Sequence, residues 1–362
     1  MVRADRLNSG PVPTWKKQQE LNMSGAQTEN EVNRAGVLDP IPRPETLHAE
    51  LPKDGLYRIL SLDGGGAKGD YTLGVLKEIE GMLGCPLYKR FDLIFGTSTG
   101  SIIGALLAIG CEVDQIHELY KSHVVSIMAQ RKPAAKTAAL ARLANDVFKD
   151  RKFEAVKTAV GIVTTKWIIH RPMIFKGSVA QAHGRTGTFS PGFGCTIGDA
   201  VQASCSAYPY FDRKTVTTHT GDKIELVDGG YCANNPTLYA MADAIGPLNI
   251  LRDDIRVVSI GVGEYPEPKP KFFTKARWIR YLLSVQLLQR TLEINTQSMD
   301  QLRAILFKDV PTARISDAYT QPEMATDLFE HDLEKLNILW QRGRESFAKQ
   351  ESLLKDYLLP KV

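Results

Sequence analysis

Short apolar runs alternate with longer segments of helical periodicity in the central part of the chain. The run Leu56–Leu62 has the length and the bounding turn of a buried strand, and apolar positions at helical spacing follow it from Tyr71 to Leu83. Phe91–Phe95 predicts a second strand, and Ser98–Ile109 predicts a buried helix. Strands that alternate with helices are typical of a mainly parallel sheet covered on both faces, so the pattern predicts an α/β fold.

Later segments extend this pattern to the end of the chain. Further strands are predicted at Trp167–Phe175, Lys223–Val227 and Ile255–Ile260. Apolar residues at 3.6-residue spacing over 276–307 and 323–359 predict a helical C-terminal part, 270–362. Residues 1–54 are polar and punctuated by prolines, which is typical of an arm outside the packed core. We therefore divide the chain into that arm and one domain over 55–362, with its core motifs at 56–263.

Composition and charge narrow the classes of function. The chain of 362 residues is 43% hydrophobic and 24% charged, which is ordinary for a soluble globular protein. A net charge of +4 is too small to indicate a nucleic-acid partner. Five scattered cysteines predict neither a disulfide framework nor a zinc site, and no cofactor is expected. Without an apolar leader or a stretch long enough to span a bilayer, we expect a cytoplasmic protein that meets lipid only at a membrane surface.

A Gly-x-Ser-x-Gly sequence lies directly after the second predicted strand, at Gly96–Gly100. A tight turn from strand to helix holds its serine in strained backbone angles and requires small flanking residues. Ser98 would then stand exposed at the N-terminus of a helix, whose partial positive charge favours a developing negative charge. The turn predicts Ser98 as a nucleophile; the alternative is a serine that only caps the following helix.

A second glycine-rich turn, Asp63–Gly69, follows the first predicted strand. Consecutive glycines allow several backbone N–H groups to point to one place, as an oxyanion hole requires, so we predict Gly64, Gly65 and Gly66 as its donors. The glycines of this turn also match a dinucleotide-binding fingerprint. That fingerprint includes an acidic residue at the end of the next strand, where this chain has the serine turn instead. Two neighbouring strand ends that carry a donor-rich loop and a serine favour acyl transfer.

A serine hydroxyl needs a neighbouring group that accepts its proton. Of the seven histidines, only His331 follows Asp228 in the order found in α/β-hydrolases, and it lies in a polar stretch whose pattern indicates a helix. Asp228 ends a predicted strand and precedes Gly229 and Gly230, so its carboxylate can point toward Ser98. The alternative for Asp228 is an ordinary Asp-Gly hairpin turn.

Together these motifs resemble those of the patatin-like phospholipases. Asp63–Gly69 is similar to the family's DGGG-x-[RK]-G loop, Gly96–Gly100 to its serine turn, and Asp228-Gly-Gly to its catalytic D-G-[GA]. Residues 199–211 resemble its Ala-Ser-x-Ala-x-Pro-x-Phe segment, and residues 257–263 resemble a later strand and glycine turn. All five features occur in the family's order.

The resemblance implies a three-layer α/β/α sandwich and a Ser–Asp dyad without histidine. Ser98 would attack an acyl ester of a membrane phospholipid, Asp228 would accept its proton, and the N–H groups of Gly64, Gly65 and Gly66 would hold the oxyanion. The size of the chain and its helical C-terminal extension also resemble the bacterial patatin-like effectors of anti-phage (CBASS) signalling. That resemblance implies activation by a cyclic dinucleotide and action at the inner membrane surface, and it leaves a homo-oligomer open.

Other hypotheses stay open from the sequence. One is an α/β-hydrolase-type esterase that uses His331; another is a nucleotide-binding regulatory module in which Ser98 is structural. A third is a membrane-surface scaffold built on an inactive hydrolase fold. Two basic clusters, within 129–160 and 269–281, interleave cations with apolar residues. The first predicts a helix face that rests on anionic lipid or covers the active site, and the second predicts contact with lipid headgroups or a phosphate-bearing regulator. Ordinary surface helices are the alternative for both.

Overall fold

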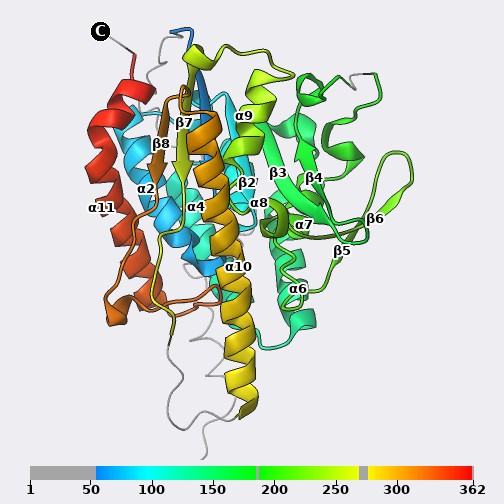
Figure 1. Cartoon of the computed structure of the whole chain (residues 1–362). Helices are drawn as coiled ribbons and strands as arrows, with labels where there is room; N and C mark the ends of the chain where they lie inside the picture. The colour runs from blue at the N-terminus through cyan, green and yellow to red at the C-terminus, as the bar shows by residue number, and fades with distance from the viewer. Residues whose placement is uncertain (1–53, 185–186, 269–275, 361–362) are drawn as a thin grey trace, which may run out of the picture. The chain divides into compact units, whose positions relative to one another are not determined.

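An eight-stranded mixed sheet organises the part of the chain that the structure, a computed structural model, describes: residues 54–184, 187–268 and 276–360 (Figure 1). The order of the strands is β5-β6-β3-β2-β1-β7-β8, and β4 also pairs with β3. The strands are β1 (Tyr57–Leu62), β2 (Leu93–Thr97), β3 (Ala159–Lys166), β4 (Arg171–Lys176), β5 (Lys214–Thr217), β6 (Lys223–Asp228), β7 (Ile255–Ile260) and β8 (Thr312–Ile315). The arm predicted for 1–54 lies outside the described residues, apart from its last position.

The middle of the sheet is parallel, as the alternation of strands and helices predicted. β1 lies between β2 and β7, and β3 and β8 extend this parallel set on either side. Among the described strands, four of the seven pairings are parallel, and the antiparallel ones involve β4, β5 and β6. The structure confirms four predicted strands, and their ends lie within two residues of the predicted ends: β1, β2, β6 and β7.

Helices cover both faces of the sheet and complete the three predicted layers. They are α2 (Gly69–Leu83), α3 (Thr99–Ile109), α4 (Val113–Leu119), α5 (Val125–Met128), α6 (Pro133–Leu143), α7 (Ile197–Ser204), α8 (Gly230–Ala233), α9 (Thr237–Ile245), α10 (Ala276–Leu306) and α11 (Leu333–Leu358). Phe95 packs with Met241 of α9 on one face, whereas its neighbour Ile94 meets α3 at Gly104 on the other. Successive residues of a strand point to opposite faces, so one strand serves both helical layers.

The strand predicted at Trp167–Phe175 is wrong in its first half. β3 ends at Lys166 and β4 begins at Arg171, so residues 167–170 form the turn between them. Aromatic and β-branched residues favour strands when they pack against a sheet face. Here Ile168 is 76% exposed and Ile169 is 53% exposed, so these side chains have no such face to pack on.

The C-terminal part is helical, as predicted, but it contributes a strand as well. α10 ends at Leu306, and α11 begins only at Leu333 rather than near 323. Between them β8 joins the sheet beside β7, and α11 packs along α2 (Figure 1). A strand of four residues, such as β8, is too short to be distinguished from a loop by its sequence pattern. No helix within the described ranges is both long enough and apolar enough to cross a bilayer.

Candidate active site

One edge of β3 brings the two predicted catalytic side chains together. β2 runs parallel to β3 and ends with Thr97 opposite Val163. β6 runs antiparallel to β3 and ends with Asp228 opposite Thr164, the next residue. β4 occupies the other edge of β3 at these positions, so β2 and β6 share one edge and meet end to end there. The residue after β2, Ser98, therefore lies beside Asp228.

The turn at Ser98 has the strained geometry that its sequence predicted. Ser98 has φ 51° and ψ −123°, and a Cβ at Gly100 would lie 2.2 Å from the carbonyl oxygen of Leu62. The Ser98 hydroxyl does not cap α3; it donates a 2.8 Å hydrogen bond to Oδ2 of Asp228. The alternative of an ordinary helix cap is therefore not supported.

Burial makes Asp228 a stronger base than an exposed aspartate. Its side chain is almost fully buried, and burial raises the pKa of Asp228 to about 6, although hydrogen bonds from Gly230 and Ser98 favour the ionised form. The N–H of Gly230 donates to its Oδ1 at 2.7 Å, which orients Oδ2 toward Ser98. At neutral pH the carboxylate is ionised and can accept the proton of the Ser98 hydroxyl.

The candidate histidine lies apart from this pair. His331 is exposed, and it lies in the loop before α11 rather than in the helix that the sequence indicated. Its Nδ1 lies 3.0 Å from the carbonyl oxygen of Phe329. No histidine is found among the described residues that line the cavity beside Ser98 and Asp228.

Ser204, at the end of α7, is a site residue that reasoning on individual residues missed. Its hydroxyl accepts a 2.8 Å hydrogen bond from the N–H of Ser98 and donates a 2.6 Å hydrogen bond to the carbonyl oxygen of Val163. The N–H of Asp228 donates to the carbonyl oxygen of Ser206 at 3.0 Å. The segment 199–211 thus holds both members of the pair. Only its resemblance to a family motif could have indicated this role.

The glycine loop has two free donors rather than the three predicted. The N–H of Gly64 donates to the carbonyl oxygen of Asn234 at 3.0 Å. Among the described residues, none accepts a hydrogen bond from the N–H of Gly65 or Gly66. Gly66 has φ +59°, and its carbonyl oxygen accepts a 2.6 Å hydrogen bond from Thr99 Oγ1. The predicted oxyanion donors therefore narrow to Gly65 and Gly66.

An apolar cavity of about 560 Å³, including its opening to solvent, adjoins the pair. Aliphatic and aromatic side chains dominate its wall: Ile102, Val124, Ile127, Met128, Leu140, Phe211, Leu292, Leu328 and Phe329. Lys136 of α6 is buried behind this wall, where its Nζ donates to the carbonyl oxygen of Met128 at 2.7 Å. Lys136 of the first basic segment is therefore buried against the site, whereas most of the segment's other cations are exposed, as on an ordinary surface helix. The side chains of the second basic cluster lie outside the described residues.

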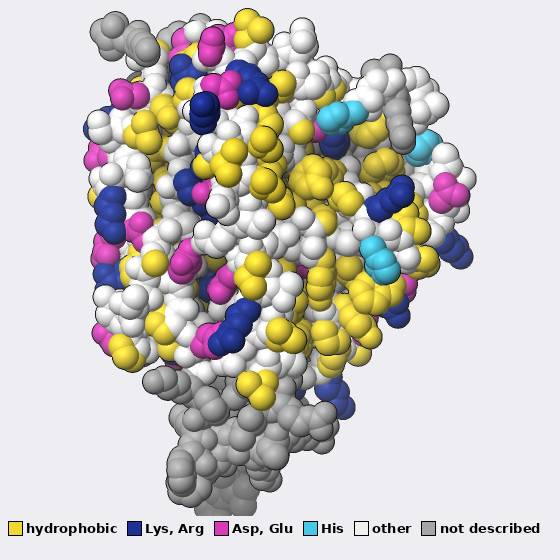
Figure 2. Space-filling model, viewed as in Figure 1, with side chains coloured by type: hydrophobic (Ala, Val, Ile, Leu, Met, Phe, Trp, Pro, Cys, Tyr) yellow, Lys and Arg dark blue, Asp and Glu magenta, His cyan; other side chains and the backbone are white. Residues whose placement is uncertain are grey.

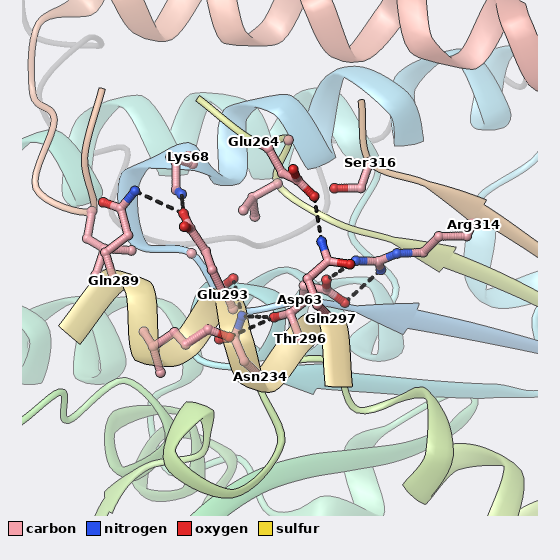
Figure 3. A pocket seen from close by; sticks show the side chains of 16 residues that line it. Asp63, Lys68, Asn234, Glu264, Gln289, Glu293, Thr296, Gln297, Arg314 and Ser316 are labelled. Carbon is pink, nitrogen blue, oxygen red and sulfur yellow. Dashed lines mark hydrogen bonds and ion pairs between the residues drawn. The ribbon is translucent and has the colours of Figure 1, made fainter. Parts of the chain in front are cut away.

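A second, polar pocket adjoins the glycine loop (Figure 3). Arg314 of β8 holds both carboxylate oxygens of Asp63, at 3.0 and 2.5 Å, at the start of the loop. Lys68 points toward Glu293 of α10, at 3.4 Å (Figure 3). Asn234 Nδ2 donates to Thr296 of α10 at 2.7 Å. The C-terminal elements therefore hold the glycine loop in place.

A phosphate on the glycine loop would meet an unfavourable environment. The cavity that Gly65 and Gly66 line also contains the carboxylate of Asp228. A phosphate bound in the same cavity would carry charge of the same sign as this carboxylate, and like charges repel each other. The arrangement fits a neutral ester carbonyl that acquires negative charge transiently better than a resident phosphate, and it does not favour a nucleotide-binding module.

Comparison with known proteins finds one matching family and several similar proteins. Residues 60–241, half of the chain, match the family described as patatin-like phospholipase. A cUMP-AMP-activated phospholipase from Escherichia coli is 64% identical over 318 residues, which cover 87% of this chain and 98% of that protein. A cGAMP-activated phospholipase from Escherichia coli strain TW11681 is 28% identical over 62% of this chain and 67% of its own length. The solved structure of VipD from Legionella pneumophila aligns with a TM-score of 0.43 and 12% identity, over 89% of this chain and 72% of that one.

Proposed function

The chain belongs to the patatin-like phospholipase family, and we propose that it cleaves acyl esters of membrane phospholipids with Ser98 as nucleophile and Asp228 as base. The observation that carries this proposal is the 2.8 Å hydrogen bond from Ser98 Oγ to Asp228 Oδ2 beside an apolar cavity. A nucleophile hydrogen-bonded to its base is the arrangement that covalent catalysis needs.

The proposed reaction proceeds in two steps. Ser98 Oγ bonds to the ester carbonyl carbon while its proton passes to Asp228, and the N–H groups of Gly65 and Gly66 stabilise the oxyanion. The tetrahedral intermediate then breaks its bond to the leaving alcohol, which takes the proton from Asp228, and an acyl-enzyme remains. Water then attacks the acyl carbon while its proton passes to Asp228. The bond between the acyl carbon and Ser98 Oγ breaks, the proton returns from Asp228 to Oγ, and the fatty acid leaves.

The cavity supports a long acyl chain as the group transferred. Its wall is formed largely by aliphatic and aromatic side chains, and Ser98 and Asp228 lie on it. Binding sites of this kind fix an apolar ligand by burial and leave the chemistry to a few polar groups. A hydrocarbon chain would gain free energy in proportion to the apolar surface that it buries there.

We further propose that a cyclic dinucleotide activates the enzyme and that it acts at the inner membrane surface as an effector of anti-phage defence. The 64% identical relative is named for activation by cUMP-AMP, and it matches this chain over nearly all of its own length. A more distant relative is named for activation by cGAMP. These names make cUMP-AMP the first activator to test.

The test is fatty-acid release from vesicles of bacterial phospholipid by the purified full chain, with no nucleotide, cUMP-AMP or cGAMP. We expect release that requires Ser98 and increases with one nucleotide. A fluorophosphonate probe should label Ser98 under the same conditions. If neither release nor labelling occurs with any nucleotide, the proposal of a serine hydrolase is wrong; equal release in all three conditions refutes only the activation.

A further inference from the structure

The turn between β3 and β4 presents two adjacent aliphatic side chains to solvent. We call residues Trp167, Ile168, Ile169 and His170 the β3–β4 tip. Ile168 is 76% exposed and Ile169 is 53% exposed, so their packing contributes little to the fold. The tip begins three residues beyond Thr164, the partner of Asp228 on β3, which is about 10 Å along the strand. An apolar projection therefore lies near the catalytic pair.

Aromatic side chains connect the tip to the site. The rings of Trp167 and Tyr208 lie 5.3 Å apart, and the hydroxyl of Tyr231 donates to the carbonyl oxygen of Tyr208. Tyr208 and Tyr231 are both partly exposed, Tyr208 follows a residue of the cavity wall, and Tyr231 follows Asp228 by three positions. Tryptophan and tyrosine combine an apolar ring with a polar group, and they are enriched where a membrane meets water.

The chain segment that forms the tip is basic. No aspartate or glutamate occurs from residue 155 to residue 198, whereas Lys166 and Arg171 flank the tip directly. The guanidinium of Arg213 lies over the rings of Trp167 and Tyr208, at 5.2 and 5.3 Å. The nearby carboxylate of Glu225 is paired with Arg213 at 3.0 Å. Cations around an exposed apolar tip complement an anionic lipid surface.

We propose that the β3–β4 tip docks the enzyme on an anionic phospholipid bilayer, with Ile168 and Ile169 inserted among the lipids and Lys166 and Arg171 at the headgroups. Apolar side chains also gather on the face between α10 and the strands β3 to β6 (Figure 2). The docking places the lipid beside the Ser98 cavity. This inference rests on the proposed phospholipase function.

The experiment compares the double substitution Ile168→Glu/Ile169→Glu with the matched control Leu251→Glu. Leu251 is an equally exposed aliphatic residue, at 70%, but it precedes β7 and so lies at the opposite end of the parallel strands. Three quantities are measured for the full chain with its activating nucleotide: sedimentation with vesicles of phosphatidylglycerol and phosphatidylcholine, fatty-acid release from them, and hydrolysis of a soluble short-chain ester.

The tip variant should bind vesicles at least tenfold more weakly than the wild type and release fatty acid from them at least tenfold more slowly. Its hydrolysis of the soluble ester should stay within twofold of the wild type. The control should stay within twofold in all three measurements. Vesicle binding and release that equal the wild type would overturn the docking proposal and leave the proposed function intact. A change in oligomeric state with unchanged vesicle binding would assign the tip to contact with a second copy and also overturn it.

A second measurement avoids a charged substitution. An environment-sensitive fluorophore on Ile169→Cys should shift to the blue on addition of phosphatidylglycerol vesicles, whereas the same fluorophore on Leu251→Cys should not. Equal spectra at both positions would contradict insertion of the tip. Wild-type protein that binds vesicles through the tip but releases no fatty acid and leaves Ser98 unlabelled would instead refute the proposed function.

Discussion

The hydroxyl of Ser98 donates to Oδ2 of Asp228 at 2.8 Å, and this contact exists because two strands of opposite direction meet end to end on one edge of β3. The N–H of Gly230 donates to the other carboxylate oxygen at 2.7 Å, so the backbone orients the Asp228 carboxylate. A carboxylate in this position needs no histidine between itself and the serine.

Replacing either member of the pair should abolish ester hydrolysis. We expect Ser98→Ala and Asp228→Asn each to lower kcat for a soluble ester by about 10³-fold or more, as removal of a nucleophile or its base does in other serine hydrolases. His331→Ala, the control, should stay within twofold of the wild type because its side chain is exposed and faces Phe329. An inactive His331→Ala beside an active Asp228→Asn would instead indicate an α/β-hydrolase mechanism.

The pH dependence of catalysis should report the ionisation of Asp228. Burial raises the pKa of Asp228 to about 6, and only the carboxylate can accept the Ser98 proton. We therefore expect kcat/KM for a soluble ester to rise with pH, with a midpoint near 6, and to level off above pH 7. Labelling of Ser98 by a fluorophosphonate should follow the same curve. A midpoint unaffected by Asp228→Glu would show that another group titrates.

The same burial should lower the stability of the folded protein when Asp228 is ionised. Its folded pKa lies above the unfolded value near 4, so the wild type loses stability as pH rises from about 4 through 6. Asp228→Asn keeps an oxygen for the Gly230 N–H without the charge, and it should be more stable than the wild type by up to about 3 kcal/mol at pH 8. Urea unfolding at pH 4 and pH 8 measures this difference, which should vanish at the lower pH.

Ser204 should position the nucleophile through the backbone. Ser204→Ala leaves the N–H of Ser98 and the carbonyl of Val163 without their buried partner, which costs about 1–3 kcal/mol of stability. We expect kcat to fall about tenfold or more with little change in KM. Ser206→Ala is the matched control, because the one partner of its buried hydroxyl among the described residues is the carbonyl oxygen of Gln202. Equal kcat in both variants would contradict a positioning role.

Arg314 should be essential for the stability of the glycine loop. Arg314→Met removes the partner of Asp63, and a buried carboxylate without its cation costs about 3–5 kcal/mol. Arg252→Met, which removes an exposed pair with Asp309, should cost about 0–1 kcal/mol. Denaturant unfolding compares the two. The double substitution Asp63→Asn/Arg314→Met should recover part of the loss, and failure to do so would show that packing, not charge, dominates.

Local signals carried much of the prediction. The glycines around Ser98 and the aspartate at the end of β6 indicated a strained serine turn and a base at a strand end, since backbone freedom and turn chemistry depend on neighbouring residues. The same kind of signal failed at Trp167–His170, where strand-forming residues have no sheet face to cover. It also could not separate Gly64 from Gly65 and Gly66, because the partner of Gly64 is the carbonyl of Asn234, far along the chain.

The sequence by itself determined the residue types of the site, the turns that carry them and the alternation of strands and helices. Only the tertiary structure decided that β6 runs antiparallel to β3 and ends opposite Thr164, that Ser204 supports the Ser98 turn, and that Arg314 neutralises Asp63. The physical reason is the range of the interactions. A turn depends on a few adjacent residues, whereas strand register and the pairing of buried charges depend on groups that lie together only after the chain has folded.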